Sequence, residues 1–293
     1  MIPDTPRSLR DPAEVARRWS RLGEPRMASL LDLVARIRAE RDHTPFLDPL
    51  DGGAEARFLL LLETPGPSIG RTGLVSRDNV TGTAANLWRF LEAARIPRAD
   101  TLIWNVVPYV IHVPGAPNRA PKPAEAANAI RYLAPLLDCL PKLAVVALSG
   151  RFARLARPEV ERLRPGLLLV EMPHPSPTYV NTSPSVRARI DEALGTVRSI
   201  LANAELRSGP GAEHRQDSHV PPEDVQEQEE AMPIDDDRVE GSAKNIKGSI
   251  KEAAGKLTGD SKTEAEGKMD KAEGKIQNTI GGIKDSLRGD KRG

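Results

Sequence analysis

The sequence predicts an α/β fold of three layers, with a central four-stranded parallel sheet between two layers of helices. From residue 58 to residue 205, apolar runs of strand length alternate with segments of helical periodicity. The four predicted strands are Phe58–Leu62, Thr101–Val107, Leu143–Leu148 and Leu167–Glu171. Unbroken apolar runs are typical of parallel strands that are buried on both faces. Ligands of such a sheet bind beyond the carboxyl ends of its strands, so the loops that leave these ends are the candidate site.

The helices of this fold are predicted from apolar residues at helical spacing and from proline at helix starts. Residues 11–42 predict two amphipathic helices, the first beginning at Pro12. The remaining predicted helices are Thr83–Arg95, Pro123–Leu140, Gly150–Ala156 and Pro184–Glu205. Three prolines between Met172 and Pro177 predict an extended loop after the fourth strand.

Composition divides the chain into a core-forming part and a tail. All ten aromatic residues lie before residue 180, and residues 206–293 contain none. Residues 1–205 hold 27 basic and 22 acidic residues, whereas the tail holds 15 and 19, and ten of those 15 are lysine. We therefore expect N-terminal helices (1–49) packed on an α/β domain (50–205), then a disordered acidic linker (206–233) and a marginally helical module (234–293). Compositional drift within one tail is the alternative to a separate module.

The single cysteine limits the cofactors that the chain can hold. One cysteine, Cys139, excludes an intrachain disulfide and a cysteine-ligated zinc or iron–sulfur site, and its leucine neighbours predict a buried structural thiol. We expect no metal and no cofactor. No apolar segment reaches the length of a membrane span, so we expect a cytoplasmic protein.

Three loops at predicted strand ends carry residues suited to chemistry. Glu63 opens the turn after the first strand, and a solvated or capping carboxylate is the simpler interpretation. Asn105 ends the second strand; its amide offers a donor and an acceptor to the edge of a pyrimidine, or else it stabilises the loop. His174 lies between prolines, which restrict its conformational freedom. The glycines of residues 66–72 are too closely spaced for a phosphate loop, and Arg71 stands in place of its lysine.

Together these loops resemble the uracil-DNA glycosylase superfamily over residues 50–204. The resemblance lies in the order and spacing of Glu63-Thr64-Pro65-Gly66, Asn105 and His174-Pro175-Ser176-Pro177. It implies an enzyme that flips uracil, or another deaminated base, out of DNA and hydrolyses its N-glycosidic bond in base excision repair. The implied partner is DNA, bound by a monomer associated with the nucleoid.

The resemblance also implies a role for each matched residue. Glu63, Thr64 and His174 are the implied catalytic residues. The implied base-binding residues are Asn105, Gly66, Leu74 and Val75. The implied DNA-binding residues are Arg119, Ser149, Gly150, Arg151, Ser176, Thr178 and Tyr179. Five arginines are expected on the active loops, namely Arg71, Arg77, Arg119, Arg151 and Arg154.

Several positions depart from the pattern of the superfamily. Thr64 stands where other branches place a water-activating Asp or Asn, and Gly66 replaces the tyrosine that excludes thymine. Leu74 or Val75 replaces the stacking aromatic, while Thr178 replaces a leucine wedge that Tyr179 could supply. An alternative is therefore a weak or inactive glycosylase fold that binds DNA or a modified base.

The tail carries a second resemblance. Asp236–Gly241, Ile246–Gly248 and Gly255–Asp260 are similar to CsbD-type bacterial stress proteins, over residues 234–290. This resemblance implies an association with stress response and no particular chemistry. A third hypothesis is that the tail determines the biological role. The whole chain would then be a stress-linked interaction factor, and the sequence does not identify its partner.

Overall fold

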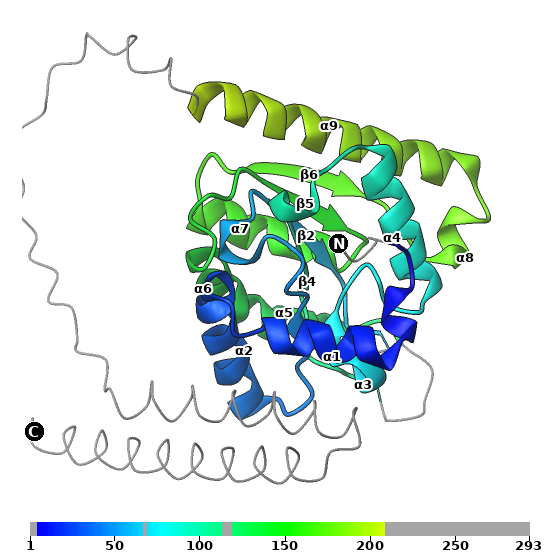
Figure 1. Cartoon of the computed structure of the whole chain (residues 1–293). Helices are drawn as coiled ribbons and strands as arrows, with labels where there is room; N and C mark the ends of the chain where they lie inside the picture. The colour runs from blue at the N-terminus through cyan, green and yellow to red at the C-terminus, as the bar shows by residue number, and fades with distance from the viewer. Residues whose placement is uncertain (1–4, 67–68, 113–118, 209–293) are drawn as a thin grey trace, which may run out of the picture.

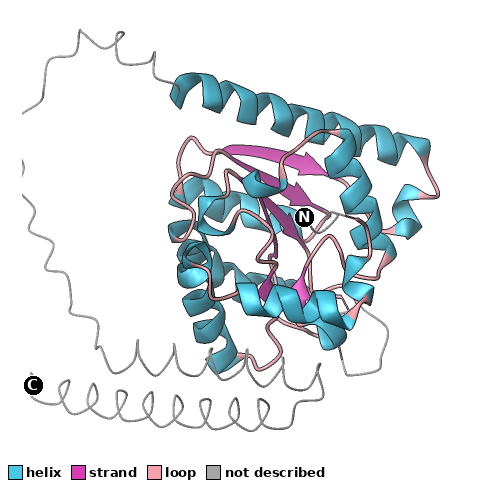
Figure 2. Ribbon diagram, in the orientation of Figure 1, coloured by secondary structure: helices cyan, strands magenta, loops and turns pink. Residues whose placement is uncertain are grey.

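The four-stranded sheet is entirely parallel. The computed structural model describes residues 5–66, 69–112 and 119–208. The strands of the sheet, in spatial order, are β4 (Thr101–Asn105), β2 (Phe58–Leu62), β5 (Val145–Ser149) and β6 (Leu168–Met172). Figure 2 shows these strands enclosed by helices. The predicted α/β fold with a four-stranded parallel sheet is confirmed.

Helices cover both faces of the sheet. Helix α4 (Gly82–Ala93) lies on one side, and α6 (Leu133–Asp138) and α7 (Arg157–Leu163) lie on the other (Figure 1). Helix α9 (Pro184–Ser208) packs against β5 and β6 and contacts α4, so it belongs to the α4 layer. Helix α6 contacts both α7 and α2 (Ala28–Glu40). The three-layer order follows from these contacts.

The four strands of the sheet differ in how far they are buried. Every residue of β2, β4 and β5 is buried, as their unbroken apolar runs predict. Strand β6 lies at the sheet edge, and its Leu168 is 51% exposed. The expectation that the fourth strand is buried was therefore wrong, and edge position alone does not account for this, because the other edge strand, β4, is buried throughout.

The two N-terminal helices form part of the same core as the sheet. Helix α1 (Pro12–Arg21) begins after Asp11, whose side chain accepts a hydrogen bond from the Ala13 N–H. Trp19 packs edge-on against Phe46, with ring centroids 5.2 Å apart, and donates a hydrogen bond to Thr72 O. Both predicted helices are confirmed. Sequence analysis missed a second parallel pair that lies beside them, β1 (Phe46–Leu47) with β3 (Leu74–Val75).

A buried ionic cluster joins α1 to the segment that follows β3. Arg18 contacts Asp48 at 2.6 Å and Asp78 at 2.8 Å, and Arg98 contacts the same two carboxylates at 2.8 Å. Ser76 also donates a hydrogen bond to Asp48. Burial alone would raise the pKa of Asp48, but Arg98 and Arg18 outweigh it and hold this pKa below its usual value. The cluster fixes the backbone around residues 76–78.

The helical predictions for residues 123–184 need correction at three places. The predicted helix Pro123–Leu140 is divided into α5 (Pro123–Ala129), a 3₁₀ turn (Ile130–Tyr132) and α6, because Pro135 cannot donate to the carbonyl one turn earlier. The predicted helix Gly150–Ala156 is only a 3₁₀ turn, Ala153–Ala156, and α7 follows it unpredicted. The proline loop ends in a helical turn, α8 (Pro177–Val180), because proline is well tolerated at a first helical position.

The remaining short helix, α3 (Ile69–Thr72), precedes β3. Among the described residues, no helix has both the length and the apolar character needed to cross a bilayer. The acidic linker and the C-terminal module predicted for residues 206–233 and 234–293 fall outside the described residues from residue 209 onward. Helix α9 reaches Ser208, three residues beyond the predicted domain boundary.

Candidate active site

The register of the sheet brings distant parts of the chain to one edge. Leu62 of β2 pairs with Asn105 of β4, and Ser149 of β5 pairs with Met172 of β6. All four strands run in the same direction, so their carboxyl ends lie along a single rim. Glu63, the loop after Asn105 and the loop that carries His174 therefore start from this rim, as the predicted topology requires.

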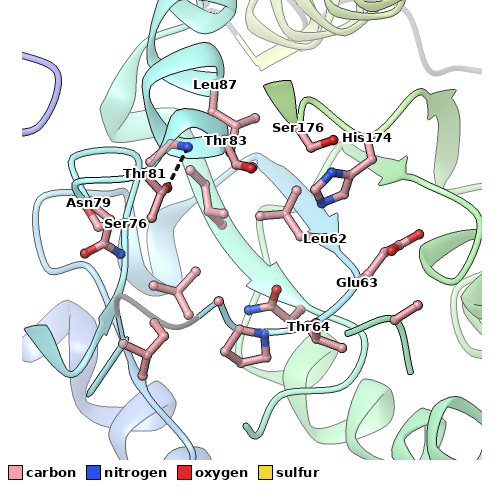
Figure 3. Close-up of a pocket in the computed structure, with 18 of the residues that line it drawn as sticks. Leu62, Glu63, Thr64, Ser76, Asn79, Thr81, Thr83, Leu87, His174 and Ser176 are labelled. Atoms are coloured by element: carbon pink, nitrogen blue, oxygen red, sulfur yellow. Dashed lines mark hydrogen bonds between the residues drawn. The ribbon is translucent and has the colours of Figure 1, made fainter. Parts of the chain in front are cut away.

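A cavity of about 520 Å³ opens at this rim, within the usual size range of small-ligand sites. Glu63, Asn105 and His174 all line it. Figure 3 shows Glu63 and His174 on one side of the cavity and Ser76 and Asn79 on the other. Three residues from separate loops, at the strand ends where the site was predicted, therefore share one cavity.

Asn105 presents an unpaired amide to the cavity. Its side chain is 2% exposed, and within the described part of the chain neither Oδ1 nor Nδ2 has a hydrogen-bond partner. A buried polar group left without a partner costs roughly 1–3 kcal/mol. An amide kept at this cost, with a donor and an acceptor side by side, is suited to a ligand that has the complementary edge.

His174 lies in an environment that favours the neutral imidazole. Burial lowers its pKa, and the nearby carboxylate of Glu63 opposes this effect without cancelling it. A neutral imidazole carries one N–H donor and one acceptor nitrogen. At neutral pH His174 can therefore donate a hydrogen bond to an oxygen in the cavity without bringing a positive charge.

Glu63 is held against the turn that follows β5. Its Oε1 accepts a hydrogen bond of 3.1 Å from the backbone N–H of Phe152. Gly150 in the same turn has φ +96°, and a Cβ placed on it would lie 2.5 Å from Glu63 Oε1. The turn can therefore approach the carboxylate only because residue 150 is glycine.

The other implied catalytic and base-binding residues divide into two groups. Thr64, Gly66 and Val75 line the cavity. Leu74 is not among the lining residues; it is fully buried in β3, where neighbouring side chains point to opposite faces. Of the two positions proposed to replace the stacking aromatic, the structure brings only Val75 to the cavity.

Four of the implied DNA-binding residues lie at the cavity: Arg119, Ser176, Thr178 and Tyr179. The Tyr179 side chain is a large apolar group that is 56% exposed. Arg119 forms a salt bridge of 2.6 Å with Glu125. An exposed aromatic ring and a cation therefore lie together at the cavity.

The turn of Ser149, Gly150 and Arg151 lies behind the cavity wall and does not line it. Ser149 is fully buried, and its hydroxyl donates a hydrogen bond of 3.4 Å to Pro173 O. Arg151 is exposed and lies over the ring of Phe152. Of these two side chains, only that of Arg151 is open to solvent.

The five arginines expected on the active loops do not form one group. Arg77 is fully buried and lies 3.9 Å from Asp51, so its placement on an exposed loop was wrong. Arg71 is exposed, while Arg154 lies 3.3 Å from Glu171. The short strand β3 that precedes Arg77 was not predicted, nor was the buried carboxylate of Asp51 that this arginine faces.

Comparison with known families agrees with this geometry. The model of a family described as the uracil DNA glycosylase superfamily matches residues 41–197, more than half of the chain. The chain belongs to this superfamily. The match contains all four strands and every residue that lines the cavity. It begins directly after α2, although α1 and α2 pack into the same core as the matched residues.

The C-terminal region matches a second family, described as CsbD-like, over residues 237–289. Curated relatives include UPF0337 proteins of Xanthomonas campestris pv. campestris and of Mesorhizobium japonicum, each 55% identical over 38 residues. These 38 residues are 13% of this chain, and the chain spans about 61% of the length of each relative. The predicted CsbD resemblance is confirmed, and the relatives' names describe no activity.

The wall of the cavity that contains Ser76, Asn79 and the start of α4 was not predicted, nor were several single lining residues elsewhere. The missed lining residues are Leu62, Pro65, Ile69, Ser76, Asn79, Thr81, Thr83, Ala84, Leu87, Ile103 and Ala120. Thr81 caps α4 by accepting a hydrogen bond from the Ala84 N–H, so this wall is the start of a helix. The capping threonine before an apolar helix was a signal that could have located it.

Proposed function

We propose that residues 50–205 form a DNA glycosylase domain that hydrolyses the N-glycosidic bond of uracil, and of other deaminated bases, in base excision repair. Membership of the superfamily supports a glycosylase-type function in general. The observation that carries the finer proposal is the unpaired amide of Asn105, which shares one cavity with His174 and Glu63.

In the proposed reaction the bond between deoxyribose C1′ and uracil N1 breaks, and its electron pair leaves with the base. The neutral imidazole of His174 donates a hydrogen bond to uracil O2, where negative charge accumulates in the transition state. Asn105 accepts from uracil N3–H and donates to O4. Because the interaction at O2 strengthens as the bond breaks, it lowers the barrier as well as binding the base.

Water completes the hydrolysis by adding to C1′ and losing a proton. Glu63 and Thr64 line the cavity near the start of the first loop and are the groups proposed to hold this water. The carboxylate of Glu63 accepts a proton better than the hydroxyl of Thr64 does. The products are free uracil and an abasic site.

DNA is the proposed partner, bound by a monomer at the rim of the cavity. Arg119, Ser176 and Thr178 are proposed to contact phosphates, and the exposed Tyr179 to fill the space that the flipped base leaves. Arg151 and the backbone of Ser149 and Gly150 are proposed to contact a further phosphate. A repair role would place the protein at the nucleoid.

The direct test is strand cleavage at uracil. Purified protein is incubated with uracil-containing single- and double-stranded DNA, and alkali then cleaves the abasic sites. We expect His174→Ala to lower the single-turnover rate by about 10²–10³-fold, the cost of removing one donor to a developing oxyanion. His43→Ala, which changes an exposed histidine outside the cavity, is the matched control and should keep the wild-type rate.

A second candidate function is binding of DNA or a modified base without turnover. Two features favour it: Thr64 offers a hydroxyl where water activation needs a stronger base, and Oε1 of Glu63 already accepts from Phe152. Retained binding to lesion DNA without abasic product, across uracil, hypoxanthine and xanthine, would support this candidate over the enzyme.

The C-terminal module (234–293) and the linker (206–233) are proposed to act separately from the glycosylase domain, in a stress response. The CsbD-like match supports this division. Deletion of residues 206–293 should leave the cleavage rate unchanged. A large loss of rate would favour the hypothesis in which the tail governs the activity of the whole chain.

A further inference from the structure

The loop that carries His174 is unusual in how little its own backbone can anchor it. Pro173, Pro175 and Pro177 alternate with His174 and Ser176. Proline has no backbone N–H, so at three positions of this loop the chain cannot donate a hydrogen bond. The carbonyl groups must therefore provide most of the backbone anchoring.

Two buried side chains bind the carbonyls on either side of His174. The hydroxyl of Ser149, at the end of β5, donates to Pro173 O at 3.4 Å. The Nδ2–H of Asn86, on α4, donates to Pro175 O at 3.0 Å. Ser149 is 0% exposed and Asn86 is 8% exposed, so water competes little for either bond.

Helix α4 contacts the same loop at a second point. A Cβ placed on Gly82 would lie 2.3 Å from Pro177 Cγ, so the first turn of the helix packs directly on the proline. Thr83 and Leu87 of this helix line the cavity, and Figure 3 shows them near Ser176. The helix that forms one wall of the cavity thus also supports the loop that carries His174.

We propose that Asn86 and Ser149 are positioning residues that hold the His174 imidazole in the cavity from its two sides. His174 lies between these two anchored carbonyls, so the position of its imidazole depends on the backbone at Pro173 and Pro175. This inference deepens the proposed function and rests on it for the catalytic role of His174. It also gives the buried hydroxyl of Ser149 a role other than contact with phosphate.

We refer to Asn86 and Ser149 together as the clamp. The kinetic test compares one variant of each clamp residue with a matched control. Asn86→Leu and Ser149→Ala each remove one donor, whereas Asn128→Leu and Ser199→Ala change exposed residues of α5 and α9. A displacement of ~1 Å at a reacting group can cost ~10²-fold in rate. We expect each clamp variant to lower the single-turnover rate on uracil-containing DNA by about tenfold or more, at unchanged KM, and the controls to match wild type.

A second readout is independent of catalysis. In protein labelled with ¹⁵N-histidine, the imidazole of His174 is assigned by its loss in His174→Ala and is titrated by NMR. Burial lowers the pKa of His174 and Glu63 is the charged group that opposes it, so a loosened loop that admits water should move the titration midpoint up toward the ordinary value. The controls should leave the midpoint in place.

The two readouts separate the clamp from the proposed reaction. If wild-type protein does not cleave DNA, the proposed function fails, and the NMR midpoint still decides whether Asn86 and Ser149 position His174. Wild-type rates and midpoints in both clamp variants would overturn the inference. If Asn86→Leu does not fold, as judged by its thermal unfolding, Ser149→Ala decides alone because it removes a single oxygen.

Discussion

The backbone N–H of Phe152 donates a hydrogen bond of 3.1 Å to Oε1 of Glu63, and so the turn after β5 fixes the carboxylate that follows β2. The two residues are 89 positions apart in the chain. Their contact depends on the missing side chain of Gly150, which leaves room for the carboxylate.

Gly150→Ala should displace Glu63 and weaken the fold. The added Cβ would lie 2.5 Å from Glu63 Oε1, at a backbone φ of +96° that alanine adopts poorly. A residue held in such a conformation costs on the order of 1–3 kcal/mol. We expect a lower free energy of unfolding in urea and a cleavage rate reduced at least tenfold. The control is Gly195→Ala, on α9, where a Cβ would have open space around it. This variant should keep both the wild-type free energy of unfolding and the wild-type cleavage rate.

The pH dependence of cleavage should report the ionisation of His174. The neutral imidazole is the proposed donor, and burial places its pKa below the ordinary histidine value of about 6.5. The cleavage rate should therefore stay constant as the pH falls to 6.5, and should decline only at lower pH, where the imidazole becomes protonated. Glu63→Gln removes the carboxylate that raises this pKa, so its midpoint should lie at still lower pH. A midpoint above 6.5 in wild type would contradict the assignment.

Asn105→Leu should stabilise the protein while abolishing recognition of the base. The amide of Asn105 is buried and unpaired, and its removal should raise the free energy of unfolding by roughly 1–3 kcal/mol. Cleavage of uracil-containing DNA should fall by more than 10²-fold. Asn86→Leu makes the same change at an asparagine whose Nδ2 is hydrogen-bonded, and it should lower stability. Equal effects on stability at both sites would argue against an unpaired amide.

Gly66→Tyr should narrow the range of bases that the cavity accepts. A Cβ on Gly66 would have no atom within 4 Å, so the new side chain can enter the cavity without displacing the backbone. We expect cleavage of hypoxanthine and xanthine to fall more than cleavage of uracil, measured on oligonucleotides that differ only in the target base. A uniform loss on all three bases would instead indicate a general disturbance of the site.

Arg18→Met should be strongly destabilising. It leaves Asp48 and Asp78 buried with one fewer cation, and breaking a buried ion pair on one side typically costs about 3–5 kcal/mol. Urea unfolding should show this loss, whereas Arg17→Met, which removes a half-exposed cation from the same helix, should cost under about 1 kcal/mol. A small effect at Arg18 would mean that Arg98 alone satisfies both carboxylates.

The central part of the fold and the three key residues could be predicted because they depend on local patterns. Unbroken apolar runs identified β2, β4 and β5, and parallel topology then required that Glu63, Asn105 and His174 meet at one rim. The lining residues Ser76 and Asn79, which lie between β3 and α4, could not be predicted in the same way. Strand β3 has two residues and pairs with β1, about 28 positions earlier, so no periodic pattern in either segment signals the pair.

The direction in which individual side chains point could not be predicted from the sequence either. Leu74 and Val75 are adjacent apolar residues, and only the pairing with β1 decides which one reaches the cavity. Ser149 was expected to follow a buried strand, yet it is the last residue of β5, and its hydroxyl donates inward to Pro173 O. Burial of this kind depends on tertiary neighbours and not on residue type.

The length and direction of helix α9 determine where a group fused to the end of this domain would be located. The helix has 25 residues and runs from beside α8, next to Tyr179, to the opposite end of the sheet (Figure 1). At about 1.5 Å per residue it covers roughly 38 Å. A reporter or surface tether joined after Ser208 would therefore start far from the rim that carries the cavity, and would leave the cavity of the immobilised protein open to large ligands.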